Sequence, residues 1–297
     1  MSGESTYEPR VAVRVSKRHV RGVDYHVSEW GDAAAPRIVF LHGWGDAGST
    51  FQFVVDALAG DWHVVAPDWR GFGRSTCRSA AYWFPDYLAD LDCLLAEYSP
   101  AEPVRLVGHS MGANVAGLYA GAMPERVSAF VNIEGFGLAD SDPGEAPERY
   151  RNWLELARTT PVLARFEDFD ALARYIARRS PGMSAAQAQF VARAWAIAGD
   201  DGLQLRVDPT HKLPNAVLYR RAEAESCWRA VTAPVLLVTG ADSNILEAFG
   251  EHLVGGNVQL PFPDSDSCVI DAAGHMVHFE APRALAAAIE DFFRPTL

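Results

Sequence analysis

The stretch that most constrains this chain is VRLVGHSMGANVA, which runs from Val104 to Ala116. Its apolar-rich start predicts a buried strand, and the small residues from Ala113 onward predict a helix. Ser110 therefore falls in a sharp turn from strand to helix. Gly108 and Gly112 flank it at the two places where a side chain would collide with the strand or the helix. The pattern G-x-S-x-G in this context predicts an exposed, nucleophilic serine.

Strands and helices alternate on both sides of this turn. Apolar and polar positions alternate at 11–15 and 25–29, which predicts an antiparallel pair of half-buried strands near the N-terminus. Further apolar runs predict strands at 37–41, 62–66, 127–134, 235–240 and 267–270, and amphipathic patterns predict helices at 87–98 and 282–293. This alternation is typical of an α/β protein.

Between 135 and 233 the alternation stops, and helical patterns separated by prolines take its place, at 148–157, 169–179 and 185–198. We therefore predict an α/β core formed by 1–134 and 234–297, with a helical cap formed by 135–233. Because the insertion leaves the sheet after one strand and returns at the next, we expect it to cover the edge where the loops gather, as a lid over a cleft.

A serine hydroxyl needs a base to take its proton, and nine histidines are available. His275 follows a predicted strand and precedes a helix, which places it at the same sheet edge as Ser110. His278 is the nearest rival and is interpreted as a packing or hydrogen-bonding residue. His109 is given a structural role, and His42 is expected to brace its own loop.

The base needs a carboxylate that holds its tautomer and stabilises the imidazolium. Asp242 follows the strand at 235–240 and lies between the serine and the histidine in chain order, so it is the preferred acid. Glu134 ends the preceding strand and satisfies the same order. It remains the alternative acid.

An oxyanion that develops on the substrate needs two fixed donors. The backbone N–H of Met111 is one, because it lies at the start of a helix, where the helix dipole favours negative charge. The other is the backbone N–H of Trp44 in HGWGD, since the glycines let that loop bend toward the serine.

These segments together resemble the α/β-hydrolase family, because HGWG, DWRGFGRS, GHSMG, VLLVTGADS and GHMVHFE occur in the family's order. The resemblance implies an eight-stranded, mostly parallel sheet with helices on both faces and a helical cap. It also implies a catalytic triad of Ser110, Asp242 and His275 without a metal or an organic cofactor. The HGWG and GHSMG segments are similar to those of small carboxylesterases.

The implied reaction is hydrolysis of a carboxylic ester or thioester through an acyl-enzyme. Six aromatic residues suggest that the substrate carries a small to medium apolar acyl or aromatic group: Tyr82, Trp83, Phe84, Trp153, Phe166 and Trp195. Serine counts against the dehalogenases and epoxide hydrolases of the family, which need an aspartate nucleophile. Carbon–carbon bond hydrolysis and perhydrolysis by the same triad remain open, as does a small-molecule receptor that keeps the fold.

The formal net charge of −12 argues against nucleic acid or an anionic membrane as a partner, although the arginines of the predicted cap leave an acyl carrier or coenzyme A open. The four cysteines have no metal-ligand spacing. The N-terminus lacks the pattern of a secretory signal, and no run of 18 apolar residues occurs. We therefore expect a cytoplasmic protein with free thiols and a small-molecule substrate, of undetermined oligomeric state.

Overall fold

The computed structural model describes residues 6–75, 77–159, 161–244, 253–254 and 257–294. Its centre is an eight-stranded sheet in the order β1-β2-β4-β3-β5-β6-β9-β12, in which β2 runs antiparallel to β1 and β4 and the other pairs are parallel. The predicted architecture, including the antiparallel start, is confirmed. The strands of this sheet are β1 (Arg14–Val20), β2 (Val23–Trp30), β3 (Arg37–Leu41), β4 (His63–Pro67), β5 (Val104–His109), β6 (Val127–Ile133), β9 (Val235–Gly240) and β12 (Ser265–Ile270).

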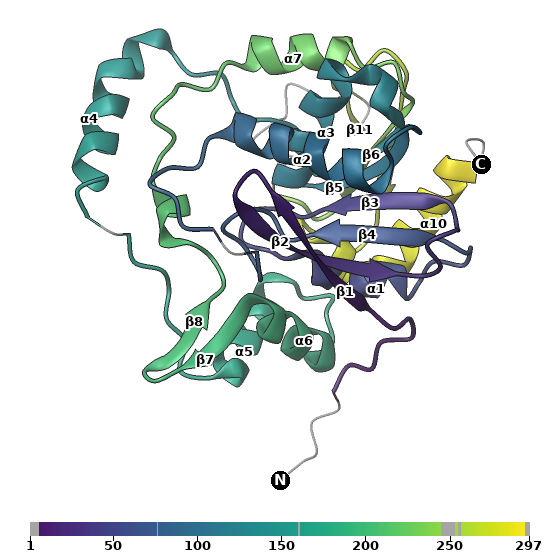
Figure 1. Ribbon diagram of the computed structural model, residues 1–297, viewed down its shortest axis with the longest axis horizontal. Coiled ribbons are helices and arrows are strands. Elements are labelled where there is room, and N and C mark those ends of the chain that lie inside the picture. Colours follow the sequence, from purple (N-terminus) through teal and green to yellow (C-terminus); the bar gives the residue numbers. More distant parts are fainter. Residues whose placement is uncertain (1–5, 76, 160, 245–252, 255–256, 295–297) are drawn as a thin grey trace.

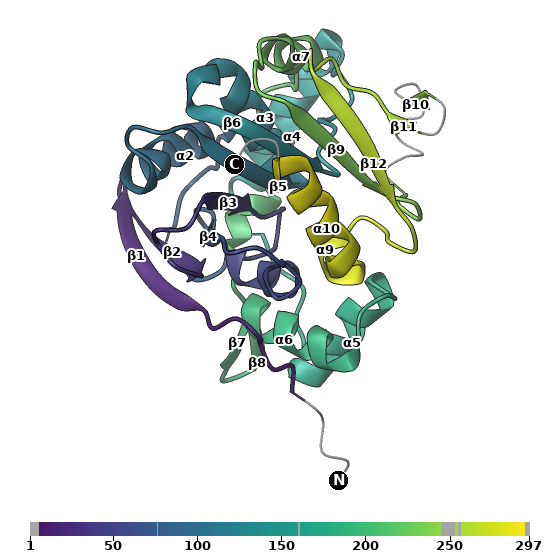
Figure 2. The same ribbon diagram turned by 90° about the vertical axis from the view of Figure 1, so that its right-hand side faces the viewer.

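Helices cover both faces of the sheet (Figures 1 and 2). One face packs against α2 (Phe84–Tyr98), α3 (Met111–Ala122) and α7 (Arg221–Arg229). The other packs against α1 (Gln52–Val55), α9 (Val277–Glu280) and α10 (Pro282–Phe293). Each face thus has its own apolar core, and the central strands are buried from both sides, as their continuous apolar runs require.

The insertion leaves the sheet after β6 and returns at β9, beyond the carboxyl ends of the parallel strands (Figure 1). It carries α4 (Ala146–Leu156), α5 (Phe169–Arg179), α6 (Ala185–Trp195) and an antiparallel pair formed by β7 (Ala196–Gly199) and β8 (Gly202–Leu205). The helix predicted at 185–198 would have included most of β7. The prediction was wrong there because the backbone of Ala196 is extended, with φ −138° and ψ 165°, and pairs with Leu205.

Helix α7, in the predicted cap, packs instead on α3 of the core. A Cβ added to Gly121 would lie 2.0 Å from the carbonyl oxygen of Cys227, and one on Gly117 would lie 3.0 Å from the indole nitrogen of Trp228. The two helices approach this closely because α3 presents glycines to α7. We therefore propose a lid only for the part of the insertion before α7.

The remaining elements are short. The 3₁₀ turns and the small outer strands are η1 (Gly48–Phe51), η2 (Pro124–Arg126), η3 (Pro143–Glu145), η4 (Pro209–Lys212), β10 (Leu253–Val254) and β11 (Asn257–Val258). In the described part of the chain, no helix combines the length and the apolar character that crossing a membrane would take.

Candidate active site

Ser110 occupies the turn between β5 and α3, as the sequence predicts. Its backbone has φ 51° and ψ −116°, which is strained for a residue with a side chain. A Cβ added to Gly108 would lie 2.5 Å from the Cα of Ala113, and one added to Gly112 would lie 2.1 Å from the carbonyl oxygen of Leu41. Both positions therefore require glycine, and the close packing that they allow fixes the strained turn.

The loop after β3 runs directly against this turn. A Cβ on Gly43 would come within 3.2 Å of the Cβ of Ser110. His42 holds the loop from inside the protein, because its Nδ1 donates to the carbonyl of Gly43 at 2.7 Å and its Nε2 accepts from the backbone N–H of Trp69 at 2.8 Å. The predicted bracing role of His42 is confirmed.

The two backbone groups expected to bind an oxyanion lie at this junction. Met111 is the first residue of α3, so its N–H has no acceptor within the helix. Trp44 lies in a turn that is closed by the hydrogen bond from the N–H of Asp46 to the carbonyl of Gly43. Within the described ranges, neither N–H donates a hydrogen bond to another residue, so both can serve a bound group.

His275 lies in the loop between β12 and α9, and its Nδ1 is 3.2 Å from Oε2 of Glu134. Glu134 directly follows β6 and is only 2 % exposed. Its Oε1 accepts the backbone N–H of Gly240 at 2.8 Å, and its Oε2 also accepts the hydroxyl of Ser243 at 2.6 Å. Three donors therefore fix a buried carboxylate against the imidazole and set the orientation of the ring.

This geometry favours Glu134 over the preferred Asp242 as the acid partner of the histidine. Asp242 lies beyond the end of β9, is exposed, and makes no side-chain hydrogen bond or ion pair with the rest of the described chain. Its backbone N–H is committed to the carbonyl of Ala273 at 2.9 Å. The donors that follow β9 converge on Glu134 instead, so we propose that Glu134, the alternative acid, has this role.

Ser110 and His275 face the same cavity, which has a volume of about 980 Å³ and lies between the core and the cap. The apolar residues that the cap contributes to its wall include Leu163, Phe166, Leu172, Tyr175, Ile176 and Trp195. No hydrogen bond joins the serine hydroxyl to the imidazole among the residues that the structure describes. In enzymes without bound substrate such contacts are often long, and they tighten when substrate binds.

Behind the serine turn lies a buried cluster of Asp46, His109 and His278, which the sequence did not predict as a group. Oδ2 of Asp46 is 3.1 Å from Nε2 of His278, and its Oδ1 accepts the indole N–H of Trp195 at 2.7 Å. Trp195 ends α6, so this bond ties the cap to the core. The sequence signal that could have pointed to this cluster is Asp46, the acidic residue of HGWGD. The hydrogen-bonding role predicted for His278 is confirmed.

The same cluster supports the loop that carries His275. Nε2 of His109 donates to the carbonyl of His275 at 2.9 Å, and burial lowers the pKa of His109 well below its ordinary value, so its ring is neutral. Burial alone would raise the pKa of Asp46, but the hydrogen bond and charge of His278 bring it below its ordinary value. The possible ligand atoms of the three residues lie within 4.8 Å of one another, which would suit a metal, but the existing hydrogen bonds already satisfy both oxygens of Asp46.

Comparison with known proteins identifies the family of this chain. The model of the family described as "alpha/beta hydrolase fold" matches residues 36–282. The chain belongs to the α/β-hydrolase family. A 3-hydroxybutyrate-oligomer hydrolase from Cupriavidus necator is 31% identical over 301 residues, which span 94% of this chain and 95% of the relative. A serine hydrolase-like protein from Danio rerio is 25% identical over 274 residues, which span 90% of this chain and 84% of the relative.

A solved structure of a hypothetical protein from Pseudomonas aeruginosa PAO1 is similar throughout. Its TM-score is 0.80 at 26% identity, and the match covers 95% of this chain and 100% of that one. The match thus extends over the insertion as well as the rest of this α/β-hydrolase. The names of the two relatives support hydrolase activity.

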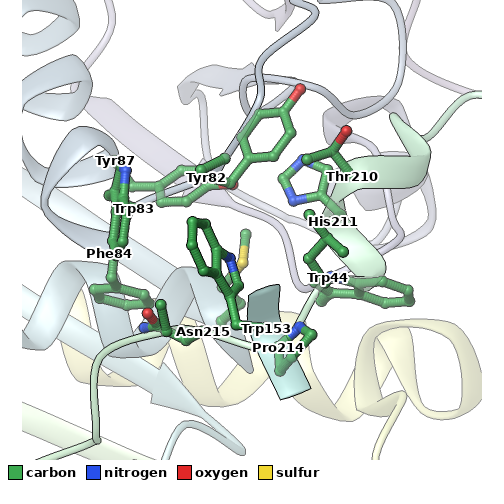
Figure 3. A pocket seen from close by; sticks show the side chains of 14 residues that line it. Trp44, Tyr82, Trp83, Phe84, Tyr87, Trp153, Thr210, His211, Pro214 and Asn215 are labelled. Carbon is green, nitrogen blue, oxygen red and sulfur yellow. The ribbon is translucent and has the colours of Figure 1, made fainter. Parts of the chain in front are cut away.

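This α/β-hydrolase also has a second, smaller compartment of about 150 Å³ (Figure 3). Trp44 and Met111 of the serine site contribute to its wall, together with Trp153 of α4. The sequence suggested six aromatic residues for an apolar pocket, and the structure divides them. The small compartment is lined by Tyr82, Trp83, Phe84 and Trp153, and the large cavity by Phe166 and Trp195.

Proposed function

We propose that this protein is a serine hydrolase that cleaves a carboxylic ester through an acyl-enzyme intermediate. The observation that supports this most is the strained turn of Ser110 facing the same cavity as a His275 ring held by buried Glu134. A serine becomes nucleophilic when a base takes its proton and an acid holds the base.

In the proposed mechanism, Nε2 of His275 takes the hydroxyl proton as the oxygen of Ser110 attacks the ester carbonyl. Glu134 keeps the proton on Nδ1 and stabilises the imidazolium. The N–H groups of Trp44 and Met111 donate to the oxyanion. His275 then gives its proton to the leaving alcohol as the carbon–oxygen bond breaks. Water then gives a proton to the same ring as it attacks the acyl carbon. The bond between that carbon and the oxygen of Ser110 breaks, the ring returns the proton to the serine oxygen, and the acid is released.

The cavity supports an ester with a small to medium apolar acyl or aromatic group, because its cap side is mainly apolar and its volume of about 980 Å³ accommodates an extended substrate. Oligomers of 3-hydroxybutyrate, named for the Cupriavidus necator relative, contain ester bonds of this kind. Thioesters are open to the same chemistry, because the attack on the carbonyl carbon is the same and a thiolate leaves more readily than an alkoxide.

Ser110→Ala tests the proposal. We expect turnover of p-nitrophenyl butyrate to fall to near the uncatalysed rate and fluorophosphonate labelling to disappear, while the melting temperature changes little. Sustained multiple turnover by the wild type separates an enzyme from a receptor of the same fold, which would turn over once or slowly. Full activity of the alanine variant would refute the nucleophile.

A further inference from the structure

We propose that the small compartment binds one uncharged aromatic ring of the substrate, while the rest of the ester occupies the large cavity. This inference rests on the proposed ester hydrolysis, because it assigns the two halves of one substrate. Its volume sets the size of the group. An apolar cavity of about 150 Å³ in another protein holds a benzene molecule, and this compartment has the same volume.

The walls of the compartment present aromatic surface that the protein itself does not cover. Trp44 is 53% exposed and Trp83 is 39% exposed, whereas Trp30, Trp69 and Trp228 are at most 1% exposed. Figure 3 shows both open indoles at the compartment, together with Trp153 from the cap. Large aromatic surfaces that stay open in a concave site gain most from contact with another flat ring.

The compartment carries no charge at neutral pH. No aspartate, glutamate, lysine or arginine of the described chain lines it. His211 lies between the rings of Phe72 and Tyr82, with ring centroids 3.9 and 3.6 Å away, and burial lowers its pKa to about 4. Burial also raises the pKa values of Tyr82 and Tyr87. A charged group would lose its hydration here without gaining a counter-charge, so the site selects a neutral one.

The small compartment lies next to the place where the reacting carbonyl of the ester would bind. Trp44 lines both the small compartment and the large cavity, Met111 lines the small one, and Ser110 faces the large one. The N–H groups of Trp44 and Met111 are the proposed oxyanion donors. A carbonyl bound there lies where the two spaces meet, so one half of the ester extends into each.

Two variants test the proposal from opposite directions. Ala81→Phe fills the compartment from its wall, and Trp153→Ala removes one of its aromatic walls. The neighbouring controls are Ala80→Phe and Leu154→Ala, which change exposed residues that do not line the compartment. The measurement is kcat/KM for benzyl acetate, ethyl phenylacetate and ethyl acetate. The first two carry the ring on the alcohol side and on the acyl side.

We expect at least one ring-bearing ester to be preferred over ethyl acetate by the wild type. Both compartment variants should reduce that preference by about tenfold or more, since the buried area of a ring is lost, and both controls should keep it. Equal preference for ring-bearing and ring-free esters in the wild type, or the same loss in the controls, would overturn the assignment.

A binding measurement keeps this test independent of catalysis. In Ser110→Ala, benzyl alcohol should quench tryptophan fluorescence saturably, and the added Ala81→Phe change should abolish that response. Saturable binding that survives the filled compartment would place the ring elsewhere. If Ser110→Ala retained full turnover, the proposed function would fail, whereas the binding result would still decide whether the compartment accepts a ring.

Discussion

The contact between Glu134 and His275 predicts the outcome of a paired substitution, Glu134→Gln and Asp242→Asn. Glutamine keeps the size of the side chain, and its amide oxygen can still accept the N–H of Gly240, which Glu134 accepts at 2.8 Å. Its NH₂ group then faces Nδ1 of His275, at the place where the carboxylate oxygen lay at 3.2 Å. Because an amide nitrogen donates, Nδ1 must accept, and the ring proton moves to Nε2.

That tautomer cannot take the proton of Ser110, and the imidazolium also loses its counter-charge. In serine proteases the corresponding change lowers kcat by about 10⁴-fold, which is about 5.5 kcal/mol of transition-state stabilisation. We expect a loss of about 10³- to 10⁴-fold in kcat for Glu134→Gln. Asp242→Asn should retain most of the activity, because its exposed carboxylate has no bonded partner in the described chain.

The assay is kcat for p-nitrophenyl butyrate at neutral pH, with circular-dichroism melting curves to show that each variant is folded. Glu134 is buried, so a loss of fold is the competing explanation for its variant. Fluorophosphonate titration of the folded fraction separates the two. If folded Glu134→Gln turned over normally while Asp242→Asn lost activity by the factor given above, the assignment of the acid from the contact geometry would be refuted.

Two further predictions concern stability. Gly112→Ala should lower the free energy of unfolding in urea by about 1–3 kcal/mol, because the new Cβ would lie 2.1 Å from the backbone oxygen of Leu41. An unchanged free energy of unfolding would show that the serine turn has room to relax. Burial lowers the pKa of His211 from 6.5 to about 4, so the folded protein binds this proton more weakly than the unfolded chain does. The free energy of unfolding should therefore fall by up to about 3 kcal/mol as the pH drops from 6.5 to 4. His211→Phe should lack that part of the loss in urea titrations at the two pH values, and an identical pH dependence would contradict it.

The fold was predictable because its signals are local. The strand β9 and the helix α10 have the bounds that their apolar patterns predicted, and β3 does too. Where the apolar pattern was weak or ambiguous, the predicted bounds of an element differ from the observed ones. The first strand was expected at 11–15 but runs over Arg14–Val20, since its exposed edge position leaves few apolar residues to mark it. The hairpin of β7 and β8 was missed because alanine-rich sequence continues the helical pattern into Ala196.

The acid of the site could not be chosen from sequence. Glu134 and Asp242 both follow central strands, β6 and β9, which are adjacent and parallel, so both lie at the same sheet edge and in the same chain order. The two carboxylates differ in which of them accepts the hydrogen bonds from nearby donors. The N–H of Gly240 and the hydroxyl of Ser243 donate to Glu134, and neither bond leaves any trace in the residue pattern.

Backbone strain provides the independent argument for Glu134. In the described chain, the residues other than glycine with positive φ are Arg21, Ser110, Glu134 and Ala272. Arg21 belongs to the tight turn between β1 and β2. Ser110 and Glu134 are themselves residues of the candidate site, and Ala272 lies in the loop just before the histidine. A left-handed conformation costs a residue with a side chain about 1–3 kcal/mol and persists where surrounding contacts enforce it. Asp242 carries no such strain, so the backbone distinguishes the two carboxylates in the same way as the contact with the imidazole does.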